Sequence, residues 1–390
     1  MNKYGRWAAI LTLHAGIALA ALLGPLAPAR ADAIVTAAKE AIVVDFNTGA
    51  ILLAKNADDE MVPSSMSKLM TVYLVFERLK KGTLKLTDKL TVSETAWRRH
   101  YKTGESLMFL PVNSQATVEE LLKGVIVQSG NDACSVLAEG LAGSEAAFAD
   151  LETKRGQEIG LLHSQFKNAS GVPEPGHTMT AHDLATLSAR LIRDFPEYYQ
   201  MFDERKFSFN NINQDNRNPL FYRNVEGADG LKTGHTEDGG YGVTGTVLRN
   251  GRRVIVVVNG LPSIKARADE SQNLMEWAFR EFGDRHLLKA GDSVGDAKVW
   301  LGAAPTVPIT VADEVIATVP RAGDNDMKVT ARYDEPIPAP IKKGQKIGTL
   351  TVEVANLGKQ EIALLAGADV DRLGAVGRIF AAARHVFGGG

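Results

Sequence analysis

The pattern of apolar residues changes near Gly283, and this change constrains the fold more than any other feature of the chain. Before it, segments with three- and four-residue apolar spacing alternate with short apolar runs, which predicts helices mixed with strands. Beyond it, short β-rich runs follow one another at residues 315–319, 328–333 and 346–354, separated by Gly, Pro and Asp. The sequence therefore predicts a mixed domain followed by a separate small all-β domain.

Composition sets the broad class of the protein. The length of 390 residues, with 45% hydrophobic residues, is sufficient for more than one hydrophobic core. The formal net charge of −2 gives no reason to expect nucleic-acid binding, which normally requires a strongly basic face. The single cysteine, Cys134, excludes an intramolecular disulfide and leaves the redox compartment open, and we expect it to be a core thiol.

The N-terminus has the features of a secretory signal peptide. Lys3 and Arg6 precede an apolar run over residues 7–26, and Ala29-Arg30-Ala31 provides the small residues that signal peptidase requires. An uncleaved membrane helix is the alternative, since the run is nearly long enough to cross a bilayer. Two prolines near the end of the run favour cleavage. We therefore expect an exported protein whose mature chain begins at Asp32.

Short-range signals predict the elements of the mixed domain. Residues 41–46 and 50–55 flank Asn47-Thr48-Gly49 and indicate a β-hairpin. A second hairpin is expected from residues 240–248 and 253–259 around Asn250-Gly251. Apolar periodicity predicts helices over residues 65–81, 118–127, 132–141, 181–194 and 268–282.

The last segment regains helical periodicity over residues 370–387, with apolar residues on one face and Arg378 and His385 on the other. This pattern favours an interfacial helix that contacts the inner-membrane surface. An amphipathic helix docked on the body of the protein is the alternative, because Gly374 and Gly377 weaken the helix.

Three short motifs have the residue types that nucleophilic catalysis needs: Ser65-Met66-Ser67-Lys68, Ser129-Gly130-Asn131 and Lys232-Thr233-Gly234. None is specific by itself, because each pattern occurs again elsewhere in the chain. The context of those further matches is a turn, a loop or a helix surface, and we regard them as chance occurrences. They are residues 164–167, 208–210, 271–273 and 102–104.

Ser65 and Lys68 lie three residues apart at the start of a predicted helix, so their hydroxyl and ammonium groups project from one face. The helix N-terminus adds free backbone N–H groups where an oxyanion would form. Lys68 also interrupts an otherwise apolar helix, and burial with a second cation nearby would lower its pKa toward that of a base. The pair therefore predicts a serine nucleophile with a lysine base. A lysine that reaches the surface is the alternative.

Ser129 and Asn131 lie in a turn between two predicted helices. The serine could relay a proton and the asparagine amide could hold a substrate amide, although both could equally be helix caps.

The Lys232-Thr233-Gly234 motif leads into the second hairpin and is predicted to lie on an edge strand, which can pair with an extended substrate. In this segment Thr233 offers a hydroxyl, Gly234 permits close approach, and Lys232 supplies the second cation for Lys68.

In this order the three motifs form the serine acyltransferase set of penicillin-binding proteins and class A β-lactamases. The chain resembles the low-molecular-mass penicillin-binding proteins that act as D-alanyl-D-alanine carboxypeptidases, and the resemblance covers nearly the whole mature chain. It implies an α/β (α+β) fold, with a transpeptidase-like domain whose antiparallel sheet is flanked by helices, a β-rich C-terminal domain and a membrane-associating tail. The segments that carry the resemblance are residues 63–71, 128–133, 230–236 and 338–345.

The resemblance and the sequence pattern together suggest where the chain divides. We expect a signal peptide at residues 1–31, the carboxypeptidase domain at 32–284, the β-rich domain at 285–367 and the amphipathic tail at 368–390. The tail departs from some relatives because it is short and Ala-rich and lacks their aromatic cluster.

The resemblance also implies roles for single residues. Ser65 would be the nucleophile, Lys68 the general base and Ser129 the proton relay to the leaving group. Asn131 and Lys232 would contact the substrate. The backbone N–H groups of Ser65 and His235 would form the oxyanion hole.

An enzyme that removes a terminal residue must bind a free carboxylate, for which a planar guanidinium is well suited. Arg267 follows the loop after the second hairpin, and the resemblance implies that it acts with Thr233 on the substrate carboxylate. The alternative is an exposed arginine that pairs locally with Glu270 or Ser271.

We therefore predict removal of the terminal D-Ala from peptidoglycan stem peptides through an ester of Ser65, with β-lactams as inhibitors. No cofactor is expected, and no metal, because His177, His182 and Asp183 lack the spacing of zinc ligands. The protein would be periplasmic and peripheral on the outer face of the cytoplasmic membrane.

Three other activities remain open from the sequence. One is a class A-like β-lactamase, which needs a Glu for deacylation, and Glu174 is the one glutamate in the relevant loop. The others are a D-Ala endopeptidase and a catalytically weak penicillin-binding scaffold.

Overall fold

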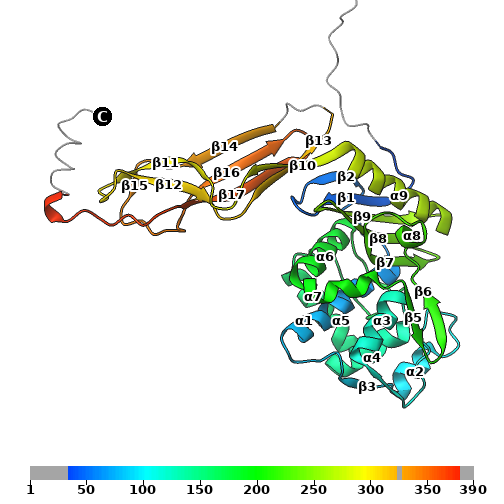
Figure 1. Cartoon of the computed structure of the whole chain (residues 1–390). Helices are drawn as coiled ribbons and strands as arrows, with labels where there is room; N and C mark the ends of the chain where they lie inside the picture. Colours follow the sequence, from blue (N-terminus) through cyan, green and yellow to red (C-terminus); the bar gives the residue numbers. More distant parts are fainter. Residues whose placement is uncertain (1–33, 323–326, 378–390) are drawn as a thin grey trace, which may run out of the picture.

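The computed structural model describes residues 34–322 and 327–377. It has a mixed body of helices and strands, from which an elongated part made of strands extends to one side (Figure 1). The predicted change from a mixed fold to an all-β fold is therefore confirmed. The predicted signal peptide and most of the predicted tail helix lie outside the described residues.

A five-stranded sheet forms the centre of the body, with the strand order β2-β1-β9-β8-β7. All neighbouring strands are antiparallel. Both predicted hairpins are present, and the segment with Lys232 lies on an edge strand, as predicted. The strands are β1 (Glu40–Asp45), β2 (Ile51–Lys55), β7 (Ala228–Thr236), β8 (Gly240–Arg249) and β9 (Arg252–Leu261).

The central strand β9 is buried on both faces. Val254, Val256 and Val258 pack on one side with the core that includes Trp277 of α9 (Ile264–Glu281). Ile255 and Val257 pack on the other side of the sheet, in the hydrophobic core that the other helices form. This alternation is the period of two that a strand imposes on its side chains, and it places helices on both faces of the sheet.

The helices on the other side of the sheet form a cluster below it (Figure 1), and in the sequence they lie between the N-terminal hairpin and β7. The predicted bounds of α3 and α6 are those observed, because Thr117 and Thr180 cap their first turns. The members of the cluster are α1 (Lys68–Lys80), α2 (Glu94–His100), α3 (Val118–Val127), α4 (Asn131–Ala142), α5 (Glu145–Glu158), α6 (Ala181–Asp194), α7 (Pro196–Tyr199) and the 3₁₀ turns η1 (Ser64–Ser67) and η2 (Gln200–Asp203).

Three predicted helices begin at other residues than expected, and the smallest difference is in α4, which begins at Asn131 and not at residue 132. The segment predicted as one helix from Ser65 starts with the 3₁₀ turn η1, and the α-helix begins only at Lys68. The helix predicted from residue 268 begins at Ile264, because the Ser263 side chain accepts a hydrogen bond from Ala266 N. Short elements complete the body: β3 (Lys89–Thr91), β4 (Gln115–Thr117), β5 (Lys206–Phe209), β6 (Ile212–Asp215) and α8 (Pro219–Tyr222).

The β-rich part begins directly after α9, at Phe282, so the expected boundary at residue 284 falls inside its first strand. Its own hydrophobic core includes Ile309, Leu350 and Leu364. Its strands are β10 (Phe282–Leu288), β11 (Ser293–Trp300), β12 (Thr306–Val311), β13 (Val315–Pro320), β14 (Met327–Tyr333), β15 (Ile337–Pro338), β16 (Lys346–Val354) and β17 (Gly358–Ala366).

Polar contacts join the β-rich part to the turn between β1 and β2. The Thr48 and Thr318 hydroxyls lie 2.6 Å apart, and Gln360 Nε2 donates to the Thr48 carbonyl oxygen at 3.1 Å. Asn47 Nδ2 donates to Asp284 Oδ2 at 3.0 Å. This junction lies on the turn of the first hairpin, whereas the motif residues lie on η1 and the start of α1, in the turn that leads into α4, and on β7.

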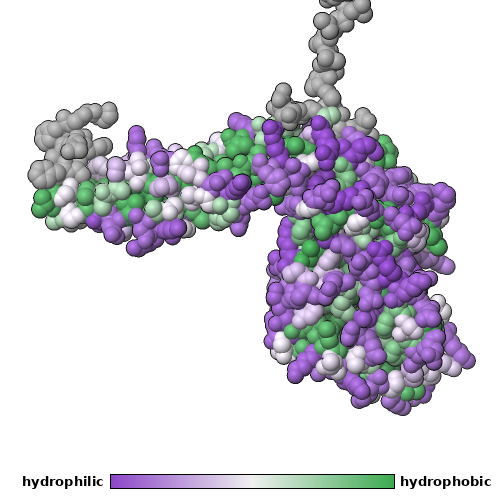
Figure 2. Space-filling model, viewed as in Figure 1, coloured by the Kyte–Doolittle hydropathy of each residue, from purple (hydrophilic) through white to green (hydrophobic). Residues whose placement is uncertain are grey.

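The visible face of the molecule is largely hydrophilic, with hydrophobic residues in small groups (Figure 2). Within residues 34–322 and 327–377, the helices are too short or too polar to cross a membrane.

Candidate active site

Ser65 and Lys68 lie side by side at the start of the α1 region. The Lys68 ammonium Nζ donates a hydrogen bond to Ser65 Oγ at 2.8 Å, and another to the carbonyl oxygen of Ser170. Lys68 is completely buried, whereas Ser65 is half-buried. A buried ammonium is stable only with such hydrogen bonds, so the contacts fix Nζ next to the hydroxyl. The surface lysine considered from the sequence is excluded.

Burial lowers the pKa of Lys68 to about 8. Nearby charges act in both directions, because Glu105 and Asp132 raise this pKa and Arg217 lowers it. The sequence predicted Lys232 as the cation that acts on Lys68. In the structure Arg217 also lowers the pKa of Lys68, and the charges of Lys68 and Lys232 repel each other.

A second lysine–serine pair joins the turn before α4 to β7. Lys232 Nζ donates to Ser129 Oγ at 3.0 Å and to the Thr233 carbonyl oxygen at 3.1 Å. Lys232 is buried, and this burial, together with the charges of Lys68 and Arg217, holds its pKa well below the usual value. The structure thus brings two of the three motifs into direct contact.

Asn131 is the first residue of α4. Its Nδ2 donates to Glu105 Oε2 at 2.9 Å, and its backbone N–H donates to the Ser106 carbonyl oxygen at 2.8 Å. The N-cap of α4 is Gly130, and no side chain caps this end. The alternative that Ser129 and Asn131 are helix caps is therefore wrong.

Gly234 allows β7 to approach η1. A Cβ atom at this position would lie 2.9 Å from the Pro63 carbonyl oxygen and 3.1 Å from Ser64 Cβ. The sequence predicted that Gly234 allows another group to come close to the strand. In the structure that group is the turn that carries Ser65. This contact holds Thr233 and His235 next to that turn.

The neighbouring residues of β7 differ in exposure. Thr233 is buried, whereas His235 is exposed and its ring stacks on Tyr241 with the ring centroids 3.8 Å apart. The backbone N–H groups expected to form an oxyanion hole thus belong to two elements, η1 and β7, that pack against each other.

Arg267, in the first turn of α9, is buried and lies next to the same strand. Its Nη1 donates to the Gly234 carbonyl oxygen at 3.4 Å, and its guanidinium lies 5.8 Å from the centre of the Tyr241 ring. Burial lowers the pKa of Arg267. Among the described residues no carboxylate pairs with this guanidinium, and its Nε has no hydrogen-bond partner.

The local pairing considered for Arg267 from the sequence is wrong. Glu270 accepts hydrogen bonds from Thr36 Oγ1 at 2.6 Å and from Ala37 N at 3.3 Å. The Ser271 hydroxyl donates to the Ala268 carbonyl oxygen. The guanidinium of Arg267 thus interacts with Tyr222 and Tyr241 but has no carboxylate partner among the described residues.

The other chemical candidates have structural partners. Ser164 Oγ donates to Asp183 Oδ2 at 2.7 Å, and exposed Glu174 accepts from Asn168 Nδ2 at 3.0 Å. Cys134 is a buried core thiol, as predicted, and burial raises its pKa to about 12. In the described part of the chain, no group of three His, Cys, Asp or Glu side chains could hold a metal ion.

Sequence reasoning missed the groups that surround the motif residues. Glu105, Arg217 and the carbonyl oxygen of Ser170 come from loops, and each acts on Lys68 or Asn131. No local pattern identifies them, because their roles depend on contacts between segments far apart in the chain. From the sequence, Glu105 and Arg217 can only be seen as charged residues in loops, which does not indicate a role in the site.

Comparison with known proteins shows which family the chain belongs to. A family model described as D-alanyl-D-alanine carboxypeptidase matches residues 27–263, and one described as penicillin-binding protein 5, C-terminal domain, matches residues 282–372. The chain is 36% identical to D-alanyl-D-alanine carboxypeptidase DacA of Haemophilus influenzae, over 87% of this chain and 86% of that protein.

Solved structures show the same relationship. Penicillin-binding protein 5 from Haemophilus influenzae matches with a TM-score of 0.82 and 35% identity, over 87% of this chain and 99% of that one. Penicillin-binding protein D2 from Listeria monocytogenes, in its cefotaxime-bound form, matches with a TM-score of 0.58 and 29% identity, over 64% of this chain and 99% of that one. The chain therefore belongs to the family of D-alanyl-D-alanine carboxypeptidases, penicillin-binding hydrolases of the cell wall, as its motifs indicate.

Proposed function

We propose that Ser65 is the nucleophile of this carboxypeptidase and Lys68 its general base. The observation that carries the proposal is the 2.8 Å hydrogen bond between Lys68 Nζ and Ser65 Oγ, made by a fully buried lysine whose pKa is lowered to about 8. A lysine with this pKa is partly neutral near physiological pH and can accept the hydroxyl proton.

In the proposed acylation step, Ser65 Oγ attacks the carbonyl carbon of the penultimate D-Ala and transfers its proton to Lys68 Nζ. The bond to the terminal D-Ala then breaks, and the proton held on Lys68 passes through the Ser129 hydroxyl to the departing amine, which leaves Lys68 neutral again. Lys232, which donates to Ser129 Oγ, fixes this hydroxyl and adds positive charge near the reacting groups. Water hydrolyses the Ser65 ester in the second step and restores the free hydroxyl.

The same proposal gives the remaining motif residues positioning roles. The backbone N–H groups of Ser65 and His235 would stabilise the oxyanion, because η1 and β7 pack together at Gly234. The edge strand β7 would pair with the extended stem peptide, with Thr233 and Asn131 as further contacts.

The pH dependence of acylation should report on Lys68. Because only neutral Lys68 can accept the proton, the rate constant for acylation should fall as the pH drops below the pKa of about 8. The measurement is kcat/KM for D-Ala release between pH 5 and pH 10. An acidic limb with its midpoint near pH 8 is expected, whereas a rate independent of pH across that range would exclude Lys68 as the base.

Arg267 is proposed to bind the terminal carboxylate of the substrate, together with Thr233. The support is its burial without a carboxylate partner among the described residues and its contact with Gly234. Arg267→Ala should cost roughly 1.5–3 kcal/mol of transition-state binding for a peptide with a free C-terminus, the scale of a hydrogen bond to a charged group.

A matched substrate makes this prediction specific. The same peptide with an amidated C-terminus has no terminal charge, so kcat/KM for it should change far less in Arg267→Ala. Equal losses on both peptides would remove Arg267 from the carboxylate site and leave Thr233 as the main candidate.

β-Lactams are proposed to acylate Ser65 and to inhibit the enzyme. The Listeria protein binds cefotaxime, and the present chain has the same type of fold with the Lys68–Ser65 pair in place.

A class A-like β-lactamase would need a glutamate that activates the deacylating water, but Glu174 is exposed and bonded to Asn168. Nitrocefin separates the two activities. A stoichiometric burst supports the carboxypeptidase, and rapid steady turnover supports the β-lactamase.

The division of the chain is also proposed from the sequence. Residues 1–31 would be a cleaved signal peptide, 32–284 the catalytic domain, 285–367 the β-rich domain and 368–390 a tail. We propose that the protein is exported to the periplasm, where its substrate is. Contact of the tail with the membrane surface stays a prediction, since residues 378–390 lie outside the described part.

A further inference from the structure

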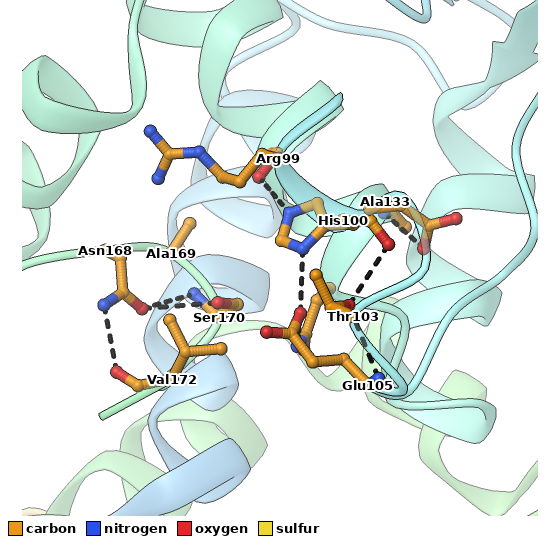
Figure 3. Close-up of polar contacts among 12 residues, drawn as sticks. Arg99, His100, Thr103, Glu105, Ala133, Asn168, Ala169, Ser170 and Val172 are labelled. Atoms are coloured by element: carbon orange, nitrogen blue, oxygen red, sulfur yellow. Dashed lines mark hydrogen bonds and ion pairs between the residues drawn. The ribbon is translucent and has the colours of Figure 1, made fainter. Parts of the chain in front are cut away.

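The carbonyl oxygen that accepts a hydrogen bond from Lys68 belongs to a turn at residues 168–171. Inside the turn, Asn168 Oδ1 accepts from the Ser170 backbone N–H at 3.2 Å and from its hydroxyl at 3.3 Å, and Asn168 Nδ2 donates to the Val172 carbonyl oxygen at 3.1 Å (Figure 3). These contacts give the turn its shape. They do not attach it to α1, the helix that carries Lys68.

Ala169 attaches this turn to two helices. Its carbonyl oxygen accepts from Thr71 Oγ1 of α1 at 2.6 Å, and its N–H donates to Glu145 Oε1 of α5 at 3.3 Å. Thr71 follows Lys68 by three residues, so the two side chains lie on one face of α1. Through them, this face contacts two successive carbonyl groups of the turn, those of Ala169 and Ser170.

The Thr71 hydroxyl lies between two oxygen atoms. One is the Ala169 carbonyl oxygen, and the other is Oε1 of Glu152 on α5, at 2.7 Å. A hydroxyl has one proton and a carbonyl oxygen can only accept, so the Thr71 proton goes to Ala169. Two oxygen atoms at 2.7 Å without a proton between them repel each other. The contact between Thr71 and Glu152 therefore requires a proton on the Glu152 carboxyl group.

The surroundings of Glu152 favour the same protonation state. The side chain is completely buried, and its second oxygen, Oε2, has no hydrogen-bond partner within the described ranges. An ionised carboxylate in such a position is costly. Burial raises the pKa of Glu152 well above its usual value, and the charge of Glu145 raises it further, whereas that of Lys68 lowers it. Glu145 itself forms an ion pair with Arg99 at 2.6 Å.

We propose that Glu152 is a protonated carboxylic acid that acts as a positioning residue for the base. It donates to Thr71, and the Thr71 hydroxyl is thereby directed onto the Ala169 carbonyl oxygen. The turn is thus fixed on α1, and the next carbonyl group, that of Ser170, stays in place to hold Lys68. The inference rests on the proposed role of Lys68, and neither Glu152 nor Thr71 contacts the substrate.

The protonation of Glu152 can be measured directly by infrared spectroscopy. The C=O stretching band of a carboxylic acid is separate from the bands of carboxylates. At about pH 8, far above the usual glutamate pKa of about 4.3, the spectrum of the wild type minus that of Glu152→Gln should contain one acid band. Acids elsewhere in the protein cancel in this difference. Absence of the band would mean that Glu152 is ionised, which overturns the proposal.

The contact between Glu152 and Thr71 is tested by the position of the same band. Thr71→Val removes the acceptor of the Glu152 proton, and the C=O band of an acid moves to higher frequency when its O–H loses a hydrogen bond. Thr71→Ser keeps the hydroxyl and should leave the band where it is. A band that stays in place in Thr71→Val would show that the two side chains are not bonded.

Acylation by a labelled penicillin tests the effect on the base. Thr71→Val should lower the limiting rate constant at saturating penicillin by about tenfold, the effect of a lost hydrogen bond at a buried position. The penicillin concentration at half-saturation should not change, because Thr71 is completely buried and lies outside the binding surface. Thr71→Ser should restore the rate constant. A wild-type rate constant in Thr71→Val would overturn the proposal.

Thr153→Val is the matched control. Thr153 is the next residue of α5, and its hydroxyl accepts from the Phe166 backbone N–H at 3.0 Å. The variant loses a hydrogen bond between a threonine and the backbone of the same loop, but not the one to Ala169. The limiting rate constant and the acid band should both stay at their wild-type values, whatever the change in the thermal midpoint.

A second pair of variants decides if Thr71→Val does not fold. Glu152→Gln keeps an N–H donor for Thr71 and should be acylated at nearly the wild-type rate, whereas Glu152→Leu has no donor and should be acylated more slowly. Equal rate constants in these two variants would contradict the positioning role. If the wild type is not acylated at all, the proposed function fails, and the infrared band still decides whether Glu152 is protonated and bonded to Thr71.

Discussion

Ser65→Ala should abolish covalent labelling by penicillin and lower D-Ala release by about four orders of magnitude or more, as expected when an acyl-enzyme nucleophile is removed. The substitution removes one hydroxyl at a half-buried position in η1 and leaves the packing of that turn intact. The thermal midpoint should therefore stay close to that of the wild type. Labelling is read by intact-protein mass spectrometry, and D-Ala release by an amino-acid assay.

Ser164→Ala is the matched control, because Ser164 and Lys167 repeat the spacing of Ser65 and Lys68. The Ser164 hydroxyl donates to Asp183 and has a structural partner. This variant should label normally. Labelling that persists in Ser65→Ala and disappears in Ser164→Ala would show that the nucleophile was assigned to the wrong motif.

Lys68→Arg should damage the enzyme as severely as Lys68→Ala, with a loss in kcat/KM of about 10²–10⁴-fold, the usual contribution of a general base. A guanidinium stays protonated at any pH at which the protein is folded, so it cannot accept the Ser65 proton. The retained positive charge would therefore not rescue activity. Substantial D-Ala release by the Arg variant would mean that Lys68 acts through its charge and that another group is the base.

Because Lys68 is fully buried, both variants need a test of folding. Circular dichroism and the thermal midpoint provide this test. Lys167→Arg is the matched control, since Lys167 occupies the corresponding place in the chance match, and it should keep full activity.

Local signals in the sequence predict much of the body of the fold. The bounds of α3 are set by an apolar face and by a capping box in which Thr117 and Glu120 bind each other's backbone N–H groups. The hairpin of β8 and β9 follows from Asn250-Gly251, and Asn250 has the positive φ that such a turn needs. The 3₁₀ turn at Ser65 could not be predicted in this way, because apolar spacing does not distinguish a 3₁₀ start from an α-helical one.

The site is predictable only to the extent that its residues lie in motifs. Ser65, Ser129 and Lys232 follow from patterns of three or four residues. The structure pairs Ser65 with Lys68 and Ser129 with Lys232, and the two lysines are close enough for their charges to interact. The burial of Arg267 could not be predicted, because its exposure depends on the packing of α9 against β7 and β8. The Glu105–His100 contact is also beyond local patterns, since it depends on how the loop after α2 folds back on α4.

The central claim is that this chain removes one residue from the C-terminus of a stem peptide. The most direct test is incubation of the purified protein with a pentapeptide that ends in D-Ala-D-Ala, followed by mass spectrometry of the products. The account predicts equal amounts of free D-Ala and the tetrapeptide, with neither formed by Ser65→Ala. An intact pentapeptide, or cleavage only at an internal bond of a cross-linked substrate, would contradict it.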